Sequence, residues 1–247
     1  MYLRESGSDD FAGACRTHAH ARAWAARPSP GARLQAPPAR RRATPPIGLR
    51  RVMDVVRALA AIIATLPLLV AIGLLIKLQD GGPMLFSQER LGRGGARFRC
   101  HKFRSMGMDA EAHLAHLLAT RPELRAEWDQ HHKLRIDPRI TPIGAFLRRS
   151  SLDELPQLFN VLKGEMSLVG PRPIVEAEIV KYGRWYAFHQ AVTPGLTGLW
   201  QVCGRNDVSY RRRIAMDRLY VRIDGVKTYL WIVLATVPAV LCRRGSY

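Results

Sequence analysis

The sequence predicts a mainly α fold with a few short strands (α+β), in which one membrane-inserted helix precedes a cytoplasmic domain with interfacial amphipathic helices. Three observations support this fold class. No residue is charged from Ala58 to Ile76, a run just long enough to cross a bilayer as a helix. Short helical patterns fill most of the remaining chain, and only two stretches have the composition of strands. At 247 residues, the chain has room for one domain and a membrane element.

Residues 1–47 are rich in Ala, Arg, Pro and Gly and show no hydrophobic periodicity. We therefore expect a disordered basic N-terminal extension. No apolar segment follows its first charges, which argues against a secretory signal. A start codon assigned too far upstream is the alternative, so whether residues 1–47 belong to the mature protein stays open.

Residues 48–80 are expected to form the membrane helix, and Gly81, Gly82 and Pro83 end it. Basic residues flank the apolar run on both sides, and the positive-inside tendency assigns both flanks to the cytoplasm. Pro67 lacks an N–H and clashes with the preceding turn, so we predict a re-entrant helix broken at Pro67. Thr65 or a neighbouring helix would satisfy the polar groups that the proline frees. A single-pass anchor that tolerates the proline is the alternative.

Residues 81–247 are expected to form the cytoplasmic domain. Residues 84–88 and 96–103 are predicted as strands joined by a glycine-rich turn. A rigid loop is expected at 170–173 and a turn-rich stretch at 193–206. The apolar segment 229–241 is too short to span a membrane, so it lies either along the membrane surface or in the core. The other helices are predicted at 109–120, from there to about 133, and at 143–149, 153–162, 175–182 and 210–220.

The formal net charge of +18 predicts anionic partners. Phospholipid headgroups, nucleotides, lipid phosphates and nucleic acid all have the required charge. No nucleic-acid motif is recognised and aromatic residues are not interleaved with the basic clusters, so nucleic acid is not expected. The four cysteines form no C-x-x-C pair and the eight histidines no H-E-x-x-H, so a zinc site is not indicated.

Asp153 and Glu154 are adjacent carboxylates at the start of a predicted helix. Ser151 followed three residues later by Glu154 is a capping-box pattern, which would put Asp153 in the first turn. Pro156 fits that register poorly, so an irregular first turn is expected. In isolation, such acidic pairs are common helix-start chemistry.

The basic residues nearby favour a phosphate site over simple capping. Each lies in an otherwise apolar or turn-like segment, and Arg172 is fixed between two prolines. A carboxylate approaches a phosphate only when cations reduce the repulsion between them. Mg²⁺ takes one or two carboxylates together with substrate phosphates, so one carboxylate can hold the metal while the other attacks phosphorus. The basic residues are Lys102, Arg104, Arg148, Arg149, Arg172 and Arg205.

From about Arg50 to Tyr247 the chain resembles the bacterial sugar transferases, the monotopic polyprenyl-phosphate phosphoglycosyl transferases. The resemblance depends on separated motifs that together are specific to this family. They are Gly81-Gly82-Pro83, Gln88-Glu89-Arg90, Lys102-Phe103-Arg104-Ser105-Met106, residues 151–158 (SLDELPQL), 160–164 (NVLKG), 167–173 (SLVGPRP) and 194–202 (PGLTGLWQV), and Gly204-Arg205-Asn206.

The resemblance implies transfer of a sugar-1-phosphate from a UDP-sugar to a polyprenyl phosphate, presumed here to be undecaprenyl phosphate, with release of UMP. It implies that Asp153 is the nucleophile that carries a covalent phosphosugar, and that Glu154 helps to bind Mg²⁺. Arg205 and the other basic residues would bind substrate phosphate. The implied location is the bacterial inner (cytoplasmic) membrane with the catalytic domain facing the cytoplasm, in exopolysaccharide, O-antigen or capsule assembly. Neither the sugar nor the formation of a homodimer follows from the sequence.

One departure from the family pattern concerns the apolar C-terminal segment. Many relatives have Asp-x-Lys where this chain has Tyr229-Leu230-Trp231, and Asp224 and Lys227 lie nearby but out of register. The departure leaves open a catalytically impaired, membrane-anchored scaffold of a polysaccharide-assembly complex. Asp217 of the family pattern is retained.

Overall fold

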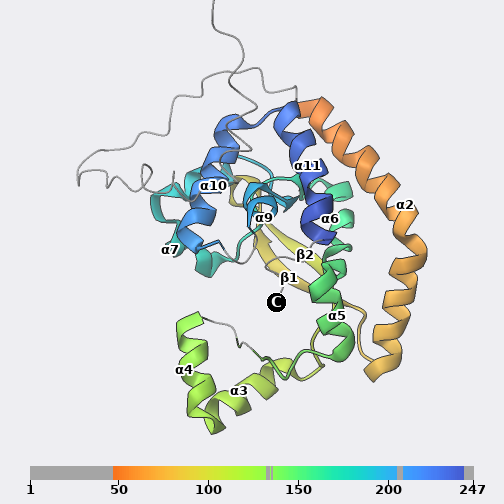
Figure 1. The fold of residues 1–247 in the computed structure, drawn as a ribbon, viewed down its shortest axis with the longest axis vertical. Coiled ribbons are helices and arrows are strands. Elements are labelled where there is room, and N and C mark those ends of the chain that lie inside the picture. The colour runs from red at the N-terminus through yellow and green to blue at the C-terminus, as the bar shows by residue number, and fades with distance from the viewer. Residues whose placement is uncertain (1–46, 132–133, 135, 205–207, 242–247) are drawn as a thin grey trace, which may run out of the picture. The chain divides into compact units, whose positions relative to one another are not determined.

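The computed structural model describes residues 47–131, 134, 136–204 and 208–241 (Figure 1). Its first element is the long helix α2, Ile47–Asp80, which contains Pro67 and matches the predicted membrane helix within two residues at each end. The helix is not interrupted at Pro67, where a break was predicted, because the backbone stays helical through the proline. Figure 1 shows α2 as one curved helix. The Thr65 hydroxyl donates to the Ala61 carbonyl at 2.7 Å, a contact that bends helices.

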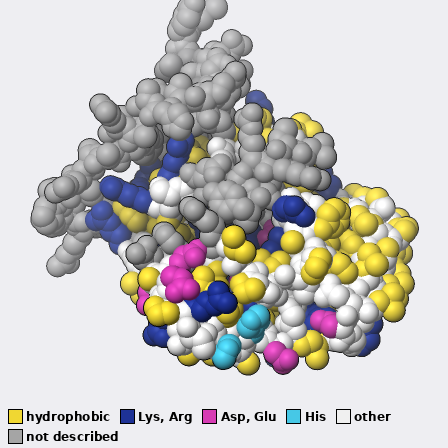
Figure 2. Space-filling view, turned by 60° about the horizontal axis from the view of Figure 1, so that its bottom comes forward, with side chains coloured by type: hydrophobic (Ala, Val, Ile, Leu, Met, Phe, Trp, Pro, Cys, Tyr) yellow, Lys and Arg dark blue, Asp and Glu magenta, His cyan; other side chains and the backbone are white. Residues whose placement is uncertain are grey.

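The length and composition of α2 are sufficient for a membrane span, and only 22% of its most apolar window is buried within the protein. Apolar side chains gather on the right of Figure 2, the side on which α2 lies in Figure 1. This exposed face is defined by Val56, Leu59, Ile63, Leu66, Leu74 and Leu78.

Both halves of α2 pack on the same domain. Ala58 and Ile62 are buried in a cluster with residues of β2 and α6. Leu69, Ile72 and Ile76 are buried in a second cluster with Phe103 and Leu147. One face of α2 is therefore part of the protein core, while the other exposes apolar side chains.

The predicted strands form an antiparallel hairpin of β1, Leu85–Leu91, and β2, Arg97–Phe103. The short helix η3, Arg93–Gly95, makes the turn, and Gly94 adopts a φ of 67° that favours glycine. Successive side chains of a strand alternate between faces, so Phe98, Cys100 and Lys102 share one face of β2. Phe98 and Cys100 are buried there, which directs Lys102 toward the interior side of the hairpin.

The next elements follow the prediction closely. They are α3, Ala110–Thr120; α4, Pro122–His131; α5, Pro142–Ser150; η4, Leu152–Glu154; and α6, Gln157–Lys163. The expected irregular start of the 153–162 helix is present as the separate turn η4. The capping-box prediction is wrong, because Ser151 has a φ of 59° and its side chain makes no capping bond. In that left-handed conformation Ser151 ends α5 instead.

A two-stranded parallel sheet in the second half was not predicted. It joins β3, Ser167–Val169, to β4, Gly195–Thr197. The helical pieces around it are η5, Glu176–Glu178; α7, Ile179–Tyr182; η6, Gly183–Trp185; α8, Tyr186–Gln190; α9, Leu199–Cys203; α10, Tyr210–Ile223; and α11, Val226–Leu241.

Helix α11 has the buried face that one of the two alternatives for the apolar C-terminal segment required. Tyr229 and Ile232 are buried in the core with residues of β3, α9 and α10. Leu230, Leu234 and Val237 are exposed on its other side. One face of α11 is thus a core face, and the other is apolar and open to the surroundings.

Candidate active site

Lys102, Glu154 and Arg172 meet in one charged cluster, although they lie on three separate segments. The Lys102 ammonium donates to Glu154 Oε1 at 2.8 Å, and the Arg172 guanidinium donates to the same oxygen at 2.9 Å. Burial alone raises the pKa of Glu154, but the charges of Arg172 and Lys102 outweigh it and hold the pKa below its ordinary value. Glu154 is therefore an ionised carboxylate held by two cations.

Asp153 lies beside this cluster and is more deeply buried, with 9% of its surface exposed. Its Oδ2 is 3.9 Å from the Lys102 ammonium. Burial raises the pKa of Asp153 and the charge of Glu154 adds to the effect, whereas Lys102, Arg172 and Arg148 oppose it. The two adjacent carboxylates thus differ: Glu154 is neutralised by direct bonds, and Asp153 is a desolvated carboxyl without such close partners among the described residues.

The backbone around Asp153 explains its position. Ser151 is the only described non-glycine residue with a positive φ, and it reverses the chain between α5 and η4. Leu147 of α5 and Leu158 of α6 are both buried, which fixes the elements on either side of the turn. Backbone strain of this kind persists when the surrounding packing imposes it, and it is frequent at functional sites.

The loop that carries Arg172 was predicted to be rigid, and in the structure its carbonyls are held from several sides. The Arg172 carbonyl contacts His189 Nε2 at 3.0 Å. The Pro171 carbonyl accepts from the Gly195 N–H at 2.8 Å, and the Pro173 carbonyl accepts from Arg90 at 3.2 Å. Little freedom is left for the loop, so Arg172 is presented to Glu154 in a fixed direction.

The other predicted phosphate-binding residues divide into three groups. Arg148 is near enough to Asp153 to affect its pKa, and its Nε donates to the Ser105 hydroxyl at 2.9 Å. Arg104 is paired with Asp80 at the end of α2 rather than with the carboxylate pair. The Arg149 Nε donates to the Ala145 carbonyl at 3.3 Å within its own helix. Arg205 lies outside the described residues.

Arg90 and His189 also belong to this site, although neither was among the candidate residues that the sequence indicated. The burial of Arg90 and the charge of Arg172 lower the pKa of Arg90, so the two guanidinium groups are close enough to repel each other. His189 is 2% exposed and supports the Arg172 carbonyl. Arg90 belongs to the Gln88-Glu89-Arg90 motif, which was the one available signal, whereas the sequence around His189 gave none.

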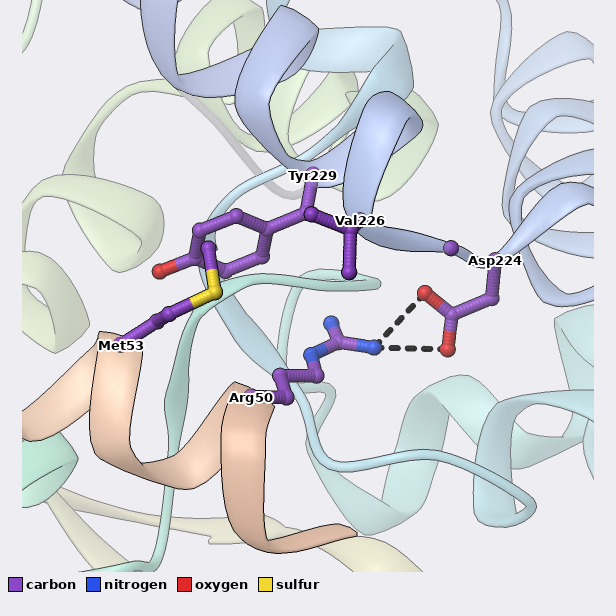
Figure 3. Close-up of a pocket in the computed structure, with 6 residues that line it drawn as sticks. Arg50, Met53, Asp224, Val226 and Tyr229 are labelled. Atoms are coloured by element: carbon purple, nitrogen blue, oxygen red, sulfur yellow. Dashed lines mark hydrogen bonds and ion pairs between the residues drawn. The ribbon is translucent and has the colours of Figure 1, made fainter. Parts of the chain in front are cut away.

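Tyr229, the position of the family departure, contacts helix α2. Its hydroxyl donates to Asp54 Oδ1 at 2.8 Å. Asp224 nearby pairs with Arg50, whose Nη1 lies 2.7 and 2.6 Å from its two carboxylate oxygens (Figure 3). The space between these residues is only about 10 Å³, which is too small for a substrate. This part of the C-terminal segment therefore packs against α2.

The carboxylate pair has the oxygen donors that Mg²⁺ prefers. Lys102 and Arg172 both bind Oε1 of Glu154, which leaves the second carboxylate oxygen and the neighbouring Asp153 to face a metal. Among the residues that the structure describes, no cluster of three or more His, Cys, Asp or Glu side chains forms a cage. Mg²⁺ does not require one, because it commonly binds one or two carboxylates together with substrate phosphates. The residues present fit this mode of binding.

Comparison with known proteins identifies the family. The model of the bacterial sugar transferase family matches residues 47–243. The UDP-galactose-lipid carrier transferase of Erwinia amylovora is 48% identical over 199 residues, which cover 81% of this chain and 42% of that protein. The undecaprenyl-phosphate galactose phosphotransferase of Salmonella typhimurium is 47% identical over the same length, with the same coverage.

A shorter relative matches almost over its whole length. The exopolysaccharide production protein ExoY of Sinorhizobium fredii is 46% identical over 204 residues, 82% of this chain and 90% of that protein. The chain thus spans less than half of the first two relatives and most of the third. It belongs to the bacterial sugar transferase family.

Proposed function

We propose that this protein transfers a sugar-1-phosphate from a UDP-sugar to a polyprenyl phosphate, with undecaprenyl phosphate as the acceptor, and releases UMP. The observation that carries the proposal is the buried Asp153 beside a Glu154 that Lys102 and Arg172 neutralise. The names of the relatives support the same chemistry, because they include transferases that act on undecaprenyl phosphate.

Asp153 is the nucleophile in this proposal. One of its carboxylate oxygens forms a bond to the phosphorus that carries the sugar, while the bond from that phosphorus to the UMP oxygen breaks and UMP leaves with the electron pair. A phosphate oxygen of the polyprenyl phosphate then forms a bond to the same phosphorus, and the bond to Asp153 breaks. The carboxylate is regenerated, and the product is a polyprenyl diphosphate sugar.

The cations around Asp153 act on the reaction in two ways. Burial raises the pKa of Asp153 above its ordinary value, and Lys102, Arg172 and Arg148 limit this rise, which favours the ionised form that attacks. The same positive charges stabilise the negative charge that develops on the phosphoryl oxygens. Asp153 and Glu154 are the residues that would hold Mg²⁺. When bound, this ion neutralises phosphate charge and removes the repulsion between the donor and the carboxylates.

The exposed apolar faces of α2 and α11 favour a reaction at the membrane surface. A polyprenyl acceptor is confined to the bilayer, and a site at its surface limits the access of water to the covalent intermediate. The basic surface of the chain suits anionic phospholipid headgroups. We therefore infer a location at the cytoplasmic face of the bacterial inner membrane, in exopolysaccharide or related glycan assembly.

The packing of α2 supports a re-entrant arrangement over a single pass. Arg51 near its start donates to carbonyls of Val161 and Leu162, and Asp80 at its end pairs with Arg104. Both ends of the helix thus contact one domain. A straight span would put those ends on opposite sides of a bilayer about 30 Å thick. A curved, uninterrupted α2 (Figure 1) with both of its ends on the cytoplasmic side is compatible with both contacts.

The decisive experiment measures UMP release from a panel of UDP-sugars without acceptor, using purified native protein and Asp153→Asn. The native protein is expected to release about one UMP per molecule and to retain a phosphosugar on Asp153, which peptide mass spectrometry locates. Asp153→Asn should release none. The exposed Asp129→Asn on α4 is the matched control and should behave as the native protein. Full UMP release by Asp153→Asn, or an adduct on another residue, contradicts the assignment.

A further inference from the structure

Asp54 is an acidic residue buried on the membrane helix, with 3% of its surface exposed. Its Oδ1 accepts a hydrogen bond from the Leu168 backbone N–H at 3.0 Å and another from the Tyr229 hydroxyl at 2.8 Å. A buried carboxylate is costly unless such bonds compensate for lost water. Anchoring in lipid requires only apolar residues, so Asp54 has a task other than anchoring.

The backbone that Asp54 holds belongs to β3. One helical turn before Asp54, Arg50 donates to the Val169 carbonyl, which also accepts from the Tyr220 hydroxyl at 3.0 Å. Figure 3 shows Arg50 reaching from α2 toward Asp224, with Tyr229 beside it. Two polar residues of α2 thus bind the N–H and the carbonyl of two consecutive residues in one strand.

The backbone between β3 and Arg172 is held in place by a hydrogen bond and by close packing. The Gly170 N–H donates to the Thr197 carbonyl at 2.9 Å. A Cβ atom at Gly170 would lie 2.5 Å from the Thr193 carbonyl oxygen, so backbone packs directly on backbone there. Pro171 follows with a fixed φ. A shift of β3 is therefore transmitted to Arg172, whose contact with Glu154 is a single bond of 2.9 Å.

We propose that Asp54 of the membrane helix is a positioning residue for Arg172, and that α2 is in this way part of the donor-phosphate site. The inference rests on the proposed function, in which Arg172 binds the phosphates of a nucleotide sugar. The soluble donor does not have to touch the membrane helix for this effect. The Tyr229 hydroxyl completes the shell around Asp54, which gives the tyrosine at the family departure a structural role.

The test separates donor handling from acceptor handling. In Asp54→Ala the Leu168 N–H loses its acceptor, and we expect the KM for the UDP-sugar to rise about tenfold, equivalent to about 1.4 kcal/mol. The KM for polyprenyl phosphate should stay within about twofold of the native value, because Asp54 acts through Arg172 on the nucleotide sugar and not on the acceptor. Asp54→Asn keeps an acceptor oxygen and should restore most of the donor affinity. Val56→Ala, on the exposed face of α2, is the matched control.

A double-mutant cycle shows whether Asp54 acts through Arg172. Coupled residues give non-additive effects, whereas independent ones add. In an Arg172→Lys background, Asp54→Ala should cause no further rise in the donor KM. The cycle is repeated with Tyr229→Phe, which removes one of the two donors to Asp54 and is a milder change. Tyr229→Phe should raise the KM for the UDP-sugar by a smaller factor, and this rise should likewise disappear in the Arg172→Lys background.

The outcomes distinguish this inference from the proposed function. Suppose that the native protein turns over a UDP-sugar. If the effects of the Asp54 and Arg172 substitutions on the donor KM then add, or if the KM values of both substrates change equally, Asp54 is a purely structural residue and the inference fails. If the native protein turns over no UDP-sugar, the proposed function fails first. Unchanged donor KM in both Asp54→Ala and Tyr229→Phe also overturns the inference.

Discussion

Asp217 on α10 is a buried carboxyl whose protonation is expected to change near neutral pH. It is 3% exposed and accepts a hydrogen bond from the Tyr182 hydroxyl at 2.7 Å. Burial raises the pKa of Asp217 from 3.8 to about 7, although Arg213 and the bond from Tyr182 oppose the shift. The native state therefore binds this proton more tightly than the unfolded chain does.

The sign of the effect on stability follows from linkage. Because the pKa is higher in the folded state, the stability that protonation provides is complete below about 3.8 and is lost as the pH rises to about 7. The difference between these two pKa values corresponds to roughly 4 kcal/mol. Asp217→Asn stays neutral at every pH. The free energy of unfolding of Asp217→Asn should exceed that of the native protein by almost nothing at low pH and by several kcal/mol in alkaline buffer.

Thermal unfolding in detergent, followed by tryptophan fluorescence, measures this difference. We expect Asp217→Asn to raise the Tm on the order of 10 °C at alkaline pH and hardly at all near pH 4. Asp129→Asn is the control, because its side chain on α4 is 63% exposed, and it should show no such pH dependence. A change in Tm that is the same at both pH values would refute the role assigned to the ionisation of Asp217.

Two further predictions concern the site and the membrane helix. Lys102 lowers the pKa of Asp153, so Lys102→Met should raise that pKa and shift the acid limb of the kcat/KM profile to higher pH; a profile of unchanged shape would contradict the charge coupling. The re-entrant arrangement predicts that Gly48→Cys and Leu78→Cys, at the two ends of α2, are both protected from a membrane-impermeant maleimide added to intact cells and become labelled after permeabilisation. Labelling of one of them from outside would establish a single pass.

Much of the architecture could be predicted because its signals are local. The charge-free run of α2, the strands around Gly94 and the interrupted helices all appear in the structure close to the expected bounds. The parallel pair β3 and β4 was missed because each strand has only three residues and the pairing joins segments far apart in the chain. Periodicity does not detect so short a strand.

The site was predicted only in part, because contacts between segments far apart in the chain decide which residues meet. Lys102, Glu154 and Arg172 converge as the charge argument required, and Arg148 lies close to Asp153. Arg104 was predicted on the same grounds, but its guanidinium pairs with Asp80 at the end of α2. Which carboxylate an arginine meets depends on how the helix end packs against the hairpin. That information is absent from residue type and spacing.

The contacts of Asp54 constrain how the protein can be synthesised. Its partners Leu168 and Tyr229 lie 114 and 175 residues further along the chain. At about 5–20 residues per second, the ribosome needs roughly 9 to 35 seconds to proceed from Asp54 to Tyr229. Until residue 168 is made the helix has a carboxylate with neither partner, and until residue 229 is made it has only one, so the contacts that hold Asp54 form late in synthesis. Docking of α2 on the domain is in this respect an event that completes folding.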